Sequence, residues 1–152
     1  MGVLYTIVPL DDSITGYLRD VGVDYPAECV PSRNPTPREL REATATLADQ
    51  KVTYSPPGHA WQIMIEGRND PDYEPWTLLN VTAFSGDETE PHSIWFEKGW
   101  PSLILRVVHI LSARCGPLVI VPDTGCTPIV VGEGDDPRIL FETWEHTRGV
   151  DR

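Results

Sequence analysis

Apolar residues alternate with polar residues in several short runs of the chain, which is the pattern of β-strands that bury one face. In the clearest run, residues 59–67, a tryptophan and two isoleucines alternate with glutamine, methionine and glutamate. Five other runs are also interpreted as strands: residues 3–8, 76–84, 92–96, 118–121 and 128–131. Turn-forming residues separate the three central runs, so we expect them to form an antiparallel meander.

A second pattern, with apolar residues three or four positions apart, predicts helices. Thr36, Pro37 and Glu39 supply an N-cap, a proline at the first helical position and a glutamate at the third, which together indicate a capping box. The most apolar helix is predicted at residues 101–116, and we expect it to be buried on more than one side. Two shorter helices are expected near the ends of the chain: residues 11–18 and a segment that opens at Asp136 and Pro137.

The predicted order of elements, β-α-α-β-β-β-α-β-β-α, lacks the regular alternation of a parallel α/β fold. We therefore expect an α+β fold in which an antiparallel sheet of five to six strands packs against a central buried helix and peripheral helices. A chain of 152 residues can bury such a core without a metal or disulfides, so residues 1–152 are predicted to form a single domain.

The chain is strongly acidic, with 12 lysine and arginine residues against 23 aspartate and glutamate residues, a formal net charge of −11. This charge repels nucleic-acid phosphates and anionic membranes and favours a cationic partner. The alternative is that acidity only keeps the protein soluble. No apolar segment approaches the roughly 20 residues of a membrane span, and the N-terminus lacks the features of a signal peptide. Three cysteines without a C-x-x-C pair indicate reduced thiols, so a cytoplasmic location is expected.

One triplet has a catalytic appearance. Asp123, Thr124 and Gly125 follow the apolar run LVIV and resemble the D-T-G motif of retroviral-type aspartic proteases, in which paired aspartates activate water. The resemblance covers only this triplet and the strand before it, and only residues 126–152 follow, which leaves little room for that family's flap. A hairpin turn explains the triplet better.

Other catalytic and metal-binding patterns are missing from the sequence. There is no nucleophile elbow, and Cys115 is expected in the core at the end of a buried helix. The four histidines lack metal-ligand spacing, and His109 is expected to be a hydrogen-bonded boundary residue. We therefore predict no catalytic residue, no metal and no cofactor.

The acidic residues gather in three predicted turns, which makes them candidates for binding a cationic partner. The three groups are Asp70, Asp72 and Glu74; Asp87, Glu88 and Glu90; and Glu133, Asp135 and Asp136. They would form one surface only if the turns converge; otherwise they are solvated loops. Among the five tryptophans, Trp100 in the loop before the long helix is the best candidate for an exposed interface anchor.

A small acidic α+β chain with tryptophans on its strands resembles the immunity proteins of bacterial polymorphic-toxin and contact-dependent inhibition systems. The resemblance is one of type, carried loosely by the segment WFEKGWPS and the acidic turns. It implies a binding or inhibitory protein, not an enzyme, that neutralises a cationic toxin domain by covering it. Two alternatives stay open. One is a hydrolase that uses Asp123, and the other is a small-ligand-binding or regulatory domain, marked by a deep apolar pocket with few convergent polar groups.

Overall fold

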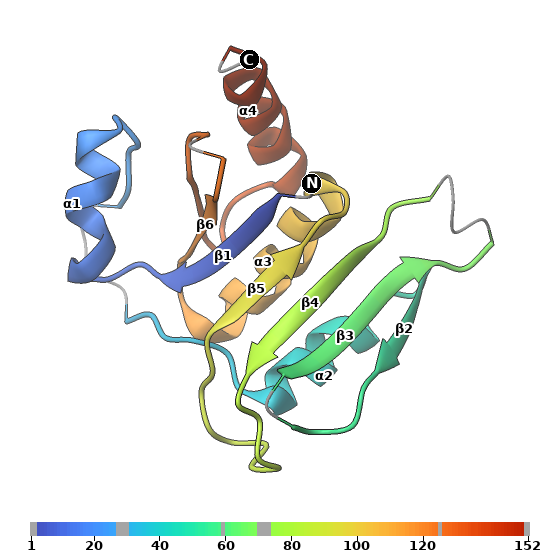
Figure 1. The fold of residues 1–152 in the computed structure, drawn as a ribbon. Helices are drawn as coiled ribbons and strands as arrows, with labels where there is room; N and C mark the ends of the chain where they lie inside the picture. Colours follow the sequence, from blue (N-terminus) through green and yellow to red (C-terminus); the bar gives the residue numbers. More distant parts are fainter. Residues whose placement is uncertain (1–2, 27–30, 59, 70–73, 125, 151–152) are drawn as a thin grey trace.

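The computed structural model describes residues 3–26, 31–58, 60–69, 74–124 and 126–150, the last six of these by their backbone only. Seven strands form one antiparallel sheet in the order β2-β3-β4-β5-β1-β6-β7 (Figure 1). The strands are β1 (Leu4–Pro9), β2 (Gln50–Tyr54), β3 (Ala60–Gly67), β4 (Thr77–Thr82), β5 (Ile94–Glu97), β6 (Leu118–Pro122) and β7 (Ile129–Val131). The helices are α1 (Asp12–Asp20), α2 (Pro37–Ala45), α3 (Pro101–Cys115) and α4 (Pro137–Val150). The predicted α+β class and the central meander are confirmed.

The sheet has one strand more than predicted. Strand β2 extends the meander at its outer edge and pairs with β3 along five residues. It was missed because only Val52 and Tyr54 supply an apolar alternation, which is too short a pattern to separate a strand from a loop.

Side chains on one face of the sheet meet the helices and form the main core. In β3 these are Trp61, Ile63 and Ile65, all fully buried, and in β5 they are Ile94 and Phe96. In Figure 1, α2 and α3 lie behind the strands, and α3 also packs against α2 and α4. Helix α3 is buried on more than one side, as its sequence predicts.

The ends of the helices follow local sequence signals. The predicted capping box is present at α2, where the Thr36 hydroxyl accepts the Glu39 N–H and the Glu39 carboxylate accepts the Thr36 N–H. Helix α3 ends at Gly116, which has a φ of 83°. A Cβ atom at Gly116 would lie 2.1 Å from the Pro31 carbonyl oxygen, so glycine is required both by the backbone conformation and by the close approach of this loop.

Helix α1 belongs to the other side of the sheet. Leu18 of α1 and Val119 of β6 are fully buried, yet neither is part of the core cluster beneath α2, α3 and α4. The side chain of Val119 points away from that cluster because its strand neighbours Leu118 and Ile120 belong to it. We infer that α1 covers only the β6 end of this second face and leaves the meander uncovered.

In the part of the chain that the structure describes, no helix combines the length and apolar character needed to cross a membrane.

Candidate functional site: the open face of the sheet

The first of the three acidic turns lies apart from the other two. Consecutive turns of the meander lie at opposite ends of the sheet, so residue Glu74, between β3 and β4, is far from the turn at 83–93, between β4 and β5. The segment 132–136 leaves β7 at the same end as 83–93, because β4 and β7 run in the same direction. Four strand spacings separate β4 from β7, however, which is roughly 19 Å.

Several of these carboxylates stabilise their own turns. Asp87 accepts hydrogen bonds from the Thr89 N–H at 2.9 Å and the Thr89 hydroxyl at 2.7 Å, which lowers the pKa of Asp87. Asp135 accepts the Gly132 N–H at 2.8 Å. Asp136 begins α4 by accepting a backbone N–H two residues later at 2.9 Å. These hydrogen bonds give Asp87, Asp135 and Asp136 structural roles in their own turns and at the N-cap of α4.

Glu88 has a long-range structural contact. Its carboxylate pairs with the Arg41 guanidinium of α2, at 2.7 Å from Nε and 3.4 Å from Nη2. The same guanidinium lies over two aromatic rings, 4.7 Å from the Trp61 centroid and 5.2 Å from the Tyr54 centroid. Glu88 therefore fastens the turn between β4 and β5 to α2.

The other predicted acidic residues have varied positions. Glu74 lies against Gly67, and Glu90 and Glu133 are exposed. Asp70 and Asp72 lie outside the described residues.

Trp100 is exposed, as its sequence position suggested. It stands at the N-cap of α3 with 41% of its surface accessible. Its backbone N–H donates to the Trp76 carbonyl at 2.9 Å, so the loop that presents it is held next to the start of β4.

Asp123 lies directly after β6 and joins this strand to β1. Its N–H donates to the Leu4 carbonyl at 2.9 Å, and its carboxylate accepts the Leu4 N–H at 3.0 Å. Strands β6 and β7 form the predicted antiparallel hairpin. A hydrolase that uses Asp123 stays a prediction without further support.

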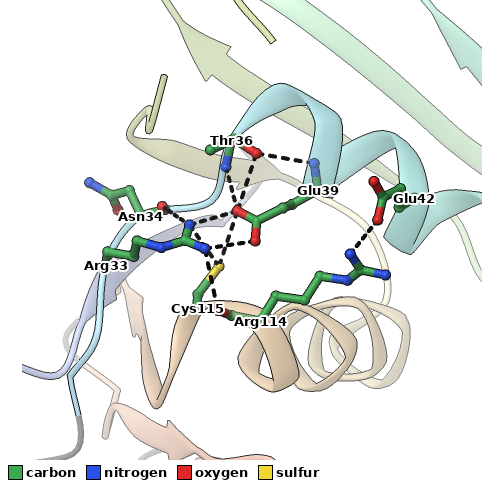
Figure 2. Close-up of polar contacts among 7 residues, drawn as sticks. All are labelled: Arg33, Asn34, Thr36, Glu39, Glu42, Arg114 and Cys115. Atoms are coloured by element: carbon green, nitrogen blue, oxygen red, sulfur yellow. Dashed lines mark hydrogen bonds and ion pairs between the residues drawn. The ribbon is translucent and has the colours of Figure 1, made fainter. Parts of the chain in front are cut away.

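A polar cluster joins the loop before α2 to the ends of two helices (Figure 2). Arg33 donates to both carboxylate oxygens of Glu39, at 2.6 and 2.8 Å, and to the Arg114 carbonyl at 3.3 Å. The Arg33 hydrogen bond is the main cause that lowers the pKa of Glu39 to about 2. A second ion pair, between Arg114 and Glu42, also links α3 to α2.

Cys115 lies inside this cluster and is only 2% exposed. Burial, followed by the charge of Glu39, raises the pKa of its thiol to about 12. A thiol with such a pKa stays protonated at neutral pH and is a poor nucleophile. The prediction that Cys115 is a core residue is therefore confirmed.

His109 is half-buried on α3, where its Nε2 lies 3.2 Å from the Glu133 carbonyl oxygen. This matches the predicted hydrogen-bonded boundary residue. Within the described ranges, no group of three histidine, cysteine, aspartate or glutamate side chains is arranged to hold a metal ion.

An open groove of about 630 Å³ lies between α3 and α4. Phe141 contributes apolar surface, and the charged residues that line it are two arginines and two carboxylates, Arg106, Arg138, Asp136 and Glu142. The volume is in the range of small-molecule sites. The balanced charges favour no class of ligand, so the small-ligand alternative also stays a prediction.

The feature that sequence reasoning missed is the second face of the meander. In Figure 1, strands β2–β5 lie in front of α2 and α3, and no helix of the described chain crosses in front of them. We call this surface the open face. Its residues alternate with the core residues along β1, β3, β4 and β5: Leu4, Thr6, Gln62, Met64, Glu66, Leu78, Asn80, Trp95 and Glu97.

The register of the strands orders the open face into rows. In one row, Glu97 stands between Leu78 and Leu4, and Met64 is the next neighbour of Leu78. Leu4 is 39% exposed, and the other three residues are half-buried. The open face therefore has apolar residues at positions where a solvated sheet face normally has polar ones.

Trp95 is the centre of the next row, between Asn80 and Thr6, with Gln62 beyond Asn80. The Gln62 side-chain amide donates to the side-chain oxygen (Oδ1) of Asn80 at 3.0 Å. Asn80 is 1% exposed, and its side-chain nitrogen has no hydrogen-bond partner among the described residues. The alternation with Ile94 and Phe96 could have placed Trp95 on this face from the sequence alone.

Comparison of the chain with protein-family models, with curated proteins and with solved structures finds no match.

Proposed function

We propose that this protein binds and inhibits a basic protein partner, as an immunity protein does, and that the open face is its recognition surface. The observation that carries this proposal is a sheet face without a helix on which Trp95 lies beside the row that contains Met64, Leu78 and Leu4. Protein interfaces combine an apolar, tryptophan-containing centre with a polar rim, and the open face has this composition.

Charge supports a basic partner. The net charge of −11 attracts a cationic domain over a long range and speeds its capture. Glu66 and Glu97 place two carboxylates on the open face itself, where Lys51 lies across from Glu66 in register. The acidic turns would then add to long-range attraction and need not contact the partner.

Asn80 gives a further reason to expect a polar contact. A buried amide donor without a partner costs about 1–3 kcal/mol, which a carbonyl oxygen of the partner would relieve after a rotation of Trp95. Such a contact would tie binding to one orientation of the partner.

The test begins with a photo-crosslinking amino acid at Leu78, used in the cells that produce the protein. The control position is Tyr17, an exposed residue of α1 that lies off the open face. We expect Leu78 to crosslink a basic protein that Tyr17 does not. Equal crosslinking from both positions would argue against the open face.

The identified protein is then expressed alone and together with this chain. Inhibition predicts that the partner arrests growth when alone and that co-expression restores growth. Trp95→Ala should abolish the protection, whereas Glu90→Lys, in an exposed turn, should leave most of it because salt screens exposed charges in the cell. Full protection by Trp95→Ala with none by Glu90→Lys would move the binding site to the acidic turn.

A further inference from the structure

Trp95 and Glu97 are neighbours on the open face. Ile94 and Phe96 of the same strand enter the core, so Trp95 and Glu97 point together to the other side. Two residues along a strand correspond to about 6.6 Å, which allows one planar group to contact both side chains.

The chemistry of both groups suits a guanidinium. The face of an indole attracts cations, and a carboxylate accepts two parallel hydrogen bonds from arginine. Among the described residues, no hydrogen bond or ion pair engages the Glu97 carboxylate or the Trp95 indole N–H. Leu4 and Leu78 flank Glu97 and would exclude water from such a pair, which strengthens it.

A partly exposed ion pair beside α2 shows this arrangement in complete form. Arg41 lies over the rings of Trp61 and Tyr54, at 4.7 and 5.2 Å, while Glu88 accepts its Nε at 2.7 Å. An aromatic ring and a carboxylate therefore hold an arginine together in this fold. On the open face, the same two kinds of group stand together on one strand.

We propose that Trp95 and Glu97 form the receptor for an arginine side chain of the partner. This inference rests on the proposed function and names the partner's chemistry at its centre. Arginine fits better than lysine because only its planar guanidinium can stack on the indole and bind the carboxylate through two nitrogens at once.

The inference is tested with two probes, tetra-arginine amide and tetra-lysine amide, added to the intact protein. Binding is followed by the NMR signal of the Trp95 indole N–H and by tryptophan fluorescence. We expect the arginine peptide to shift this signal and to bind about fivefold more tightly than the lysine peptide. Equal affinities for the two peptides would overturn the arginine receptor.

Matched variants localise the effect. Glu97→Gln and Trp95→Leu should each lower the affinity for the arginine peptide about fivefold. The controls are Glu90→Gln, which removes the same charge from an exposed turn, and Trp100→Leu, which removes an exposed tryptophan outside the Trp95–Glu97 pair. Controls that weaken binding as much as the test variants would reduce the effect to bulk charge or to nonspecific stacking.

The two proposals fail separately. If Trp95→Ala abolishes protection against the partner but Glu97→Gln leaves its affinity unchanged, the open face is the site and the arginine receptor is wrong. If the peptide binds as expected but Leu78 crosslinks no basic protein, the receptor exists and the inhibitory function is wrong.

Discussion

The two faces of the meander β2–β5 are made by the same strands and have different compositions. On the covered face, Trp61, Ile63 and Ile65 of β3 and Ile94 and Phe96 of β5 are large apolar side chains that are fully buried beneath the helices. On the open face, Met64, Leu78 and Trp95 are only half-buried and stand among polar residues. The covered face contains the main core, whereas the apolar residues of the open face lie outside it, and we propose that they serve binding.

The largest difference between the faces is expected in the stability cost of truncating Phe96, on the covered face, and its neighbour Trp95, on the open face. Phe96→Ala removes a fully buried ring and should cost about 3–5 kcal/mol of unfolding free energy through lost burial and a cavity. Chemical denaturation measures this loss. A cost under about 1 kcal/mol would mean that the covered face is not the main core.

The second effect concerns the layer that covers the sheet. Glu39→Gln removes the carboxylate, at the start of α2, that binds Arg33. Arg33 also donates to the Arg114 carbonyl at the end of α3, so it links the two helices. The pKa of Glu39 falls from 4.5 to about 2 on folding, which corresponds to roughly 3 kcal/mol. We expect Glu39→Gln to lower the free energy of unfolding by about 2 kcal/mol, because Arg33 is half exposed and the pair is partly screened by solvent.

The pH dependence of this pair has a defined sign. Since the folded pKa of Glu39 is lowered, its contribution is complete above about pH 4.5 and is lost as the pH falls towards 2. Unfolding at a series of pH values should show a shallower acid loss in Glu39→Gln than in the wild type. Parallel curves for the two proteins would contradict the assignment.

A smaller effect is expected at the cap of α2. Thr36→Ala removes the hydroxyl that accepts the Glu39 N–H at 3.2 Å and should cost about 1 kcal/mol. Thermal unfolding of Thr36→Ala and Thr36→Ser checks this, because serine keeps the hydroxyl and should restore most of the stability.

The smallest effect on stability is expected on the open face. Trp95→Ala removes a half-buried side chain that faces away from the core, and we expect a loss below about 1 kcal/mol. A loss as large as that of Phe96→Ala would show that Trp95 supports the fold, and the case for a binding surface would weaken. Together, these two variants give the sharpest measure of the difference between the faces.

Local sequence signals predicted the elements well. The capping residues Thr36 and Glu39, and the proline and glycine at either end of α3, lie close together in sequence and set the helix ends directly. Short apolar or alternating runs bounded by turn residues revealed six strands. Strand β2 escaped because its short pattern acquires meaning only when it pairs with β3.

The candidate site depended on contacts that sequence patterns do not reveal. Glu88 looked like a solvated turn residue, yet it pairs with Arg41, 47 positions away. The separation of the acidic turns follows from the strand order, which local patterns leave open. The alternation around Trp95 was visible, but only the placement of the helices shows that its side of the meander is uncovered.

The position of β1 has a consequence for the order of events during synthesis. Strand β1 is made first, yet it lies between β5 and β6, where Tyr5 pairs with Phe96 and Pro122. The meander β2–β5 needs only neighbouring hairpins and can form as soon as its own residues leave the ribosome. The first strand must wait for β5, which ends at residue 97, before it can join the sheet, and it gains its second neighbour only when β6 is complete at residue 122.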